Sequence, residues 1–153
     1  MPTPMKLDPD FKEFVGLLNS HEVRYLIIDG YAVGFHGHAR YTKDLDVWIE
    51  ATPANANALL AVLGEFGFGA IGLTTDDFQV PDQVIQLGRE PIRIDLLTSV
   101  KGAKFSDAWK RLKAVEVDDV TCKVIGLDDL RSVKAATGRP QDLADIDHLS
   151  VAN

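Results

Sequence analysis

Two aspartates that stand two residues apart are the first chemically informative feature of this sequence. Asp44 and Asp46 open the segment 44–50, DLDVWIE, whose apolar pattern predicts a β-strand. Residues two apart on a strand share one face, so both carboxylates point the same way while Leu45 and Val47 point into the core. Neighbouring carboxylates repel each other unless a cation or hydrogen-bond donors compensate them, and a divalent metal ion is the usual compensation.

A third carboxylate stands in a second apolar segment, 92–97, IRIDLL, which also predicts a strand. Asp95 is unfavourable there unless it is paired or bound to a metal ion. If the two strands are neighbours, three carboxylates converge, and three acids can hold two divalent ions. Such ions serve phosphoryl transfer: one activates an attacking hydroxyl and the other holds a triphosphate with its leaving pyrophosphate. The alternative is structural, with Asp95 paired to Arg93 and the first two aspartates paired to bases on a solvated strand.

The remaining sequence predicts the elements that must position these acids. Asp8 and Thr52, each followed by proline, and Asp128 are expected to cap helices. The pattern predicts helices over about 9–18, 31–36, 53–66, 105–112 and most of 127–150, and strands over 25–28, 44–50, 84–87, 92–97, 115–117 and 121–125. This order predicts an α/β (α+β) fold, a mixed β-sheet flanked by helices, as a single domain over residues 1–153.

Composition limits the classes of function. The chain has 153 residues, of which 46% are hydrophobic, and a formal net charge of -7, which argues against a broad basic surface for nucleic acid. With one cysteine, no visible signal peptide and no apolar run of about 20 residues, we expect a cytoplasmic protein without a membrane segment. One segment, 101–113, is locally basic; it is either a stripe that contacts RNA or the solvated face of a helix.

Further blocks surround the acids. The chain contains Asp29-Gly-Tyr-Ala32, His36-Gly37, Arg40-Tyr-Thr-Lys-Asp-Leu-Asp46, Lys134 and Arg139-Pro-Gln-Asp-Leu-Ala-Asp145. As a set, and over residues 25–149, these blocks resemble the nucleotidyltransferase (polymerase-beta-like) superfamily. The resemblance is greatest to its small bacterial members, the AbiEii-type toxins and related minimal nucleotidyltransferases.

The resemblance implies a metal-dependent enzyme that moves a nucleoside monophosphate from an NTP to an acceptor hydroxyl and releases pyrophosphate. It makes Asp44, Asp46 and Asp95 the catalytic carboxylates and the ligands of Mg²⁺ or Mn²⁺. The residues that it places at the nucleotide are Gly30, Arg40, Lys43 and Lys134.

The resemblance leaves the acceptor open. It allows tRNA or another RNA, as in a toxin-antitoxin enzyme, a small molecule of the aminoglycoside type, or a protein hydroxyl. Because the chain is short, we expect the acceptor to bind over the sheet, or a homodimer or cognate partner protein to complete the cleft.

Asp29 departs from the family pattern, which has glycine at this first position of the turn. A carboxylate beside a triphosphate would repel it by about 1–4 kcal/mol. Asp29 therefore either caps the following helix, changes nucleotide handling, or impairs the site. Impairment is compatible with a second class of protein, a non-catalytic nucleotidyltransferase-like module that binds a nucleotide or a partner protein.

Overall fold

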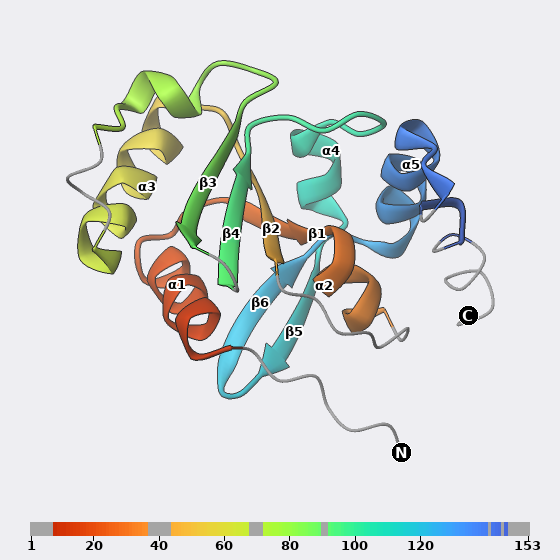
Figure 1. The fold of residues 1–153 in the computed structure, drawn as a ribbon, viewed down its shortest axis with the longest axis horizontal. Coiled ribbons are helices and arrows are strands. Elements are labelled where there is room, and N and C mark those ends of the chain that lie inside the picture. Colours follow the sequence, from red (N-terminus) through yellow and green to blue (C-terminus); the bar gives the residue numbers. More distant parts are fainter. Residues whose placement is uncertain are drawn as a thin grey trace.

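A six-stranded mixed sheet forms the centre of the structure (Figure 1). The structure is a computed structural model that describes residues 8–36, 44–67, 72–89, 92–140, 142–144 and 146. Its strands are β1 (Tyr25–Ile28), β2 (Asp44–Ile49), β3 (Val84–Arg89), β4 (Ile92–Leu97), β5 (Lys113–Val117) and β6 (Val120–Val124). They lie in the order β3-β4-β2-β1-β6-β5, in which β2 with β4 and β1 with β6 are parallel and the other neighbours are antiparallel. The predicted fold class is confirmed.

Helices lie on both sides of this sheet. They are α1 (Pro9–Ser20), α2 (Asp29–Phe35), α3 (Pro53–Phe66), the 3₁₀ turn η1 (Thr75–Phe78), α4 (Phe105–Lys110) and α5 (Leu127–Thr137). α1 and α3 cover one face, and α4 and α5 lie on the other side (Figure 1). No helix in the described ranges is long and apolar enough to cross a membrane.

Two of the three predicted helix caps are confirmed. The Asp8 carboxylate accepts the N–H of Asp10 at 2.9 Å, and the Thr52 hydroxyl accepts the N–H of Asn55 at 3.3 Å. The prediction for Asp128 was wrong, because Gly126 occupies the N-cap position and Asp128 lies in the first turn of α5. An acid in a first turn still interacts favourably with the helix dipole, which explains the misleading signal.

The faces of β2 differ in chemistry. Leu45, Val47 and Ile49 are fully buried, whereas the opposite face carries the two aspartates and Trp48. Phe105 of α4 covers Trp48 edge-to-face, with ring centroids 5.2 Å apart.

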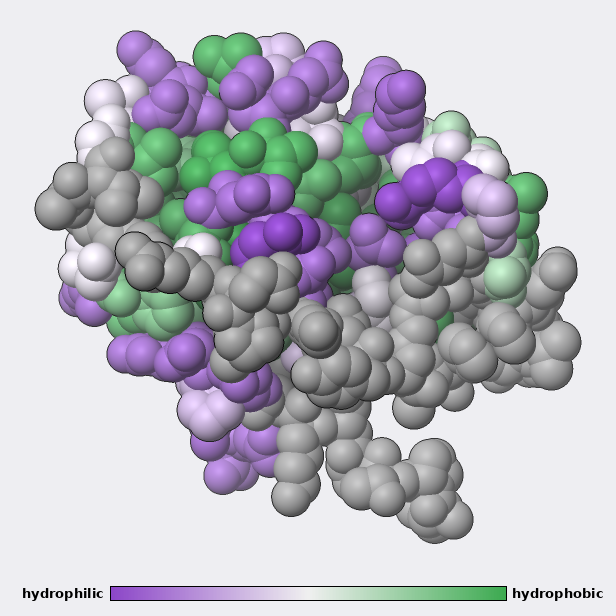
Figure 2. Space-filling model, in the orientation of Figure 1, coloured by the Kyte–Doolittle hydropathy of each residue, from purple (hydrophilic) through white to green (hydrophobic). Residues whose placement is uncertain are grey.

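Towards β3, the same face is open to solvent. The register places Val84, which is 57% exposed, and the exposed Gln86 on this face. Figure 2 shows hydrophilic surface in the middle of this side of the molecule, bordered by hydrophobic surface over β3 and β4. The acids thus lie on a sheet face that is covered at one end and open at the other.

The predicted hairpin near the end of the sheet is present. β5 and β6 pair through a turn in which Asp118 and Asp119 both have positive φ, 50° and 67°, a conformation that aspartate tolerates better than most residues. The hairpin is not wholly at the edge as predicted, since β6 pairs in parallel with β1 and only β5 is an edge strand.

Asn55 joins the strand that carries the acids to α3 and β1. Its Oδ1 accepts the N–H of Arg24 at 2.7 Å, while its Nδ2 donates to the carbonyls of Arg24 at 3.0 Å and Glu50 at 2.9 Å. Only 6% of Asn55 is exposed, so no water can easily replace these bonds. The amide therefore fixes the start of β1 against the end of β2.

We expect Asn55→Ala to lower the free energy of unfolding by about 1–3 kcal/mol, because it removes three part-buried hydrogen bonds and leaves the N–H of Arg24 and the carbonyl of Glu50 without the Asn55 amide. Urea unfolding measures this change. Asn57→Ala, at an exposed position two residues along the same helix, is the matched control; equal losses in both variants would contradict the role of Asn55.

Candidate active site

The parallel pairing of β2 with β4 brings three carboxylates together. The register aligns Asp46 with Asp95 and Asp44 with Arg93. Side chains aligned in this way stand on the same face of the sheet. The sequence condition for convergence, that the two strands are neighbours, is therefore met.

The carboxyl groups of Asp46 and Asp95 lie within reach of each other, and the raised pKa of Asp46 favours its protonated form. Burial, and then the charges of Asp29, Asp95 and Asp44, raise the pKa of Asp46 to about 8. Burial also raises the pKa of Asp95, although Arg93 opposes the shift. Burial is the largest cause of both shifts, and the charges of neighbouring carboxylates add to it.

Arg93 provides part of the compensation. Its Nη2 donates to Oδ2 of Asp44 at 3.1 Å, and its Nε lies 3.2 Å from Oδ1 of Asp95. The second contact is misaligned, so that neither Nε nor Oδ1 has a hydrogen-bond partner among the described residues although both are buried. The predicted structural pairing of Asp95 with Arg93 is thus present as an ion pair, but it leaves a carboxylate oxygen unsatisfied.

The same residues fit a divalent cation by their chemistry. Carboxylate oxygens are the ligands that Mg²⁺ prefers, and the unsatisfied Oδ1 of Asp95 is a donor atom that a cation would satisfy. The present side-chain arrangement is that of the ion pair: within the described ranges, no group of three or more His, Cys, Asp or Glu residues is placed as a metal site. Binding a metal ion would require the proton on Asp46 to leave and Arg93 to move.

Asp29, the departure from the family pattern, lies beside this cluster at the start of α2. Its φ of 63° is in the left-handed region that glycine adopts without strain, which explains why the family pattern has glycine here. Its side chain makes no capping hydrogen bond, so the capping explanation was wrong. The carboxylate instead accepts a hydrogen bond from Lys134 at 3.0 Å.

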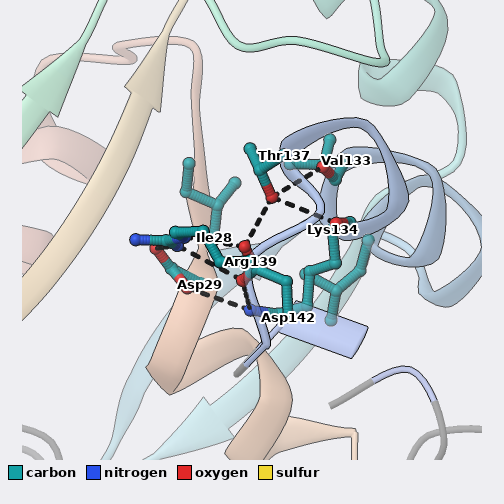
Figure 3. Close-up of a pocket in the computed structure, with 8 residues that line it drawn as sticks. Ile28, Asp29, Val133, Lys134, Thr137, Arg139 and Asp142 are labelled. Carbon is teal, nitrogen blue, oxygen red and sulfur yellow. Dashed lines mark hydrogen bonds and ion pairs between the residues drawn. The ribbon is translucent and has the colours of Figure 1, made fainter. Parts of the chain in front are cut away.

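Lys134 lies between two acids (Figure 3). It is 2% exposed and donates to Asp142 at 3.2 Å as well as to Asp29. Arg139 donates from Nε to Asp142 at 2.7 Å, and its Nη2 is 3.9 Å from Asp29. This four-residue group, which we call the charge cluster, ties the end of α5 to the turn after β1.

Asp142 is the acid to which both cations of the charge cluster donate hydrogen bonds. Burial alone would raise its pKa, but hydrogen bonds from Arg139, Thr137 and Lys134 outweigh burial and hold the pKa well below its usual range. The carboxylate therefore stays ionised at any physiological pH.

The other predicted contacts are placed as follows. Gly30 is buried in the first turn of α2, next to Asp29. Arg40 and Lys43, as well as Asp145, lie outside the described residues. The basic segment 101–113 packs through Phe105 and Trp109, whose rings stack at 5.8 Å, and Arg111 in it binds Asp129 with two hydrogen bonds.

The strand with Asp44 and Asp46 beside the strand with Asp95 is the arrangement that the resemblance to nucleotidyltransferases implies. The chain belongs to the family described as "Nucleotidyl transferase of unknown function (DUF2204)", which it matches over residues 8–153. This membership makes the protein a nucleotidyltransferase, as the sequence predicted.

Solved structures confirm the fold. The lincosamide antibiotic adenylyltransferase LnuA, solved with lincomycin bound, is similar with a TM-score of 0.59 at 13% identity over 97% of this chain and 99% of that chain. An antigenic nucleotidyltransferase-like protein from Paracoccidioides brasiliensis is similar with a TM-score of 0.52 at 14% identity over 95% of this chain and 78% of that one. No curated protein matches the sequence.

Asp46→Asn should change how stability depends on pH. Because the pKa of Asp46 is about 8 in the folded protein against 3.8 ordinarily, its contribution to stability is complete below about pH 4 and is lost as the pH rises through 8. Asparagine keeps the hydrogen bond to Asp95 but cannot ionise. The variant should therefore gain on the order of 2–4 kcal/mol over the wild type between about pH 4 and 8.

Urea unfolding at several pH values measures this difference, with the exposed Glu13→Gln in α1 as control. Parallel pH profiles for Asp46→Asn and the wild type would show that Asp46 is not protonated in the fold.

Lys134→Met should destabilise the protein by about 3 kcal/mol, because it removes a buried cation from two carboxylates. Thermal or urea unfolding measures the loss. Lys110→Met, at an exposed lysine of α4, tests the general effect of losing a positive charge. If the two variants lose the same stability, the charge cluster does not stabilise the fold.

Proposed function

We propose that this nucleotidyltransferase moves a nucleoside monophosphate from an NTP to an acceptor hydroxyl and releases pyrophosphate, with divalent cations held by Asp44, Asp46 and Asp95. The proposal depends on one observation above all: three carboxylates lie on the same face of β2 and β4, and Arg93 forms ion pairs with two of them. When bound, Mg²⁺ or Mn²⁺ would supply the positive charge that activates the acceptor hydroxyl and neutralises the triphosphate.

Asp95 is the proposed general base. It is 7% exposed and has a raised pKa, so it accepts a proton more readily than an exposed carboxylate does. Asp44 and Asp46 serve as ligands, and the proton on Asp46 leaves as the cation binds.

The turn after β1 would receive the triphosphate. Gly30 lets the backbone approach the phosphates, with Arg40 and Lys43 as further contacts. Asp29 would repel the phosphates, but Lys134 and Arg139 already face its carboxylate. In this proposal Lys134 supports nucleotide binding by neutralising Asp29 from a buried position.

We propose a small-molecule hydroxyl as the acceptor. The open end of the acidic face presents Val84 and Gln86, an apolar and a neutral side chain, rather than the lysines and arginines that an RNA backbone requires. The acidic net charge of -7 agrees with this choice. The lincosamide antibiotic adenylyltransferase LnuA is similar to this chain over 99% of its own length, so a chain of this size accommodates a small-molecule acceptor in that protein.

The test is a transfer assay with each α-labelled NTP and Mg²⁺ or Mn²⁺. One arm contains a panel of hydroxylated small molecules, lincosamides and aminoglycosides among them, and the other contains total RNA. We expect label on a small molecule, and a loss of at least about 100-fold in Asp44→Asn and Asp46→Asn, because each removes charge that stabilises the transition state.

Label on RNA would support the enzyme class but contradict the small-molecule acceptor. It would favour a tRNA-directed, toxin-type enzyme. No transfer to either arm, together with no metal-dependent NTP binding, would favour the second candidate, a non-catalytic nucleotide- or protein-binding module. The ion pairs of Arg93 with Asp44 and Asp95 are what favour that candidate, since they occupy the site with a cation of the chain itself.

A further inference from the structure

Arg93 is the basic residue that touches two of the three site carboxylates. We propose that Arg93 is an internal counter-ion, which holds Asp44 and Asp95 until a divalent cation displaces its guanidinium. This inference depends on the proposed function, since it concerns the cation that the three carboxylates would hold.

The contacts of Arg93 are suited to being exchanged. Only the bond to Asp44 is aligned, and the approach to Asp95 leaves both partner atoms without a hydrogen bond among the described residues. A guanidinium that served structure alone would be expected to bind in the two-pronged manner that Arg111 shows with Asp129, at 2.9 and 2.8 Å. The site thus holds Arg93 less firmly than another ion pair of the same protein holds its arginine.

The surroundings of Arg93 allow its side chain to move away from the carboxylates. Its side chain is 31% exposed, against 11% for Asp95. Directly across the sheet, β3 places Gly88, which has no side chain to confine the guanidinium. The side chain can therefore turn toward solvent over β3 without unfolding any element.

Charge favours the exchange. A guanidinium and a divalent cation bound to the same carboxylates repel each other. The free energy of metal binding consequently includes the cost of removing Arg93 from Asp44 and Asp95. Without the guanidinium, the carboxylates should bind the cation on the order of tenfold more tightly.

The experiment measures Mn²⁺ binding directly, by calorimetry and by the electron paramagnetic resonance signal of free Mn²⁺, at about pH 8.5, where protons compete least. The proteins are the wild type, Arg93→Gln and Arg93→Lys. Arg93→Gln should bind Mn²⁺ about tenfold more tightly than the wild type, while Arg93→Lys, which keeps a positive charge, should stay near the wild type.

Two controls separate this effect from general electrostatics. Arg111→Gln removes a positive charge at a distant ion pair and should leave Mn²⁺ affinity unchanged. In Arg93→Gln with Asp44→Asn, the gain should disappear, because one ligand is lost. Circular dichroism and thermal unfolding confirm that each variant is folded.

The outcomes distinguish the two proposals. If the wild type and Arg93→Gln bind Mn²⁺ with equal affinity, or if Arg93→Gln binds it more weakly, Arg93 is not a displaced counter-ion, and the proposed function stands. If neither protein binds Mn²⁺, the metal-dependent function and the counter-ion role are both overturned.

Discussion

Repulsion between carboxylates is the constraint on which the rest of this structure depends. The pairing of β2 with β4 places Asp46 directly beside Asp95, and Asp44 lies two residues earlier on the same face of β2. Among the described residues, this repulsion is offset by the raised pKa of Asp46, which favours a neutral carboxyl group, and by the guanidinium of Arg93. The compensation is incomplete, since Oδ1 of Asp95 is buried without a hydrogen-bond partner among the described residues. A fold selected for stability alone would more simply place apolar side chains here.

The turn after β1 also carries a negative charge that nearby cations compensate. Asp29 adds negative potential at Asp46, and it does so from a backbone conformation that glycine would adopt at lower cost. The structure compensates with Lys134 and Arg139, which Asp142 in turn holds in place. The end of α5 is thereby an electrostatic part of the site, although it contributes no ligand.

The sequence predicted what periodicity and local chemistry determine. The alternation around Asp44 and Asp46 and the caps at Asp8 and Thr52 depend on neighbours within a few residues, and the structure has each of them. The pairing of β2 with β4 could be stated from the sequence only as a condition, because no local pattern specifies which strands pair.

The contact that sequence reasoning could not assign joins Asp29 to Lys134 across 105 positions. Asp29 looked like a capping residue because aspartate before a helix usually is one. Its actual partner depends on how α5 folds back onto the turn. The three hydrogen bonds of Asn55 were missed for the same reason, because its partners are Arg24, just before β1, and Glu50, just after β2.

The parallel pairing of β2 and β4 also has a consequence for folding. Parallel neighbours cannot form from a local hairpin, because the chain must cross over before the second strand can pair. Here the crossover contains α3, η1 and β3, so Asp95 reaches Asp46 only after about a third of the chain has been ordered. The acidic site therefore requires β2, β4 and the whole crossover between them. The carboxylates come together only where the same pairing also buries apolar residues of both strands, such as Leu45 and Ile94.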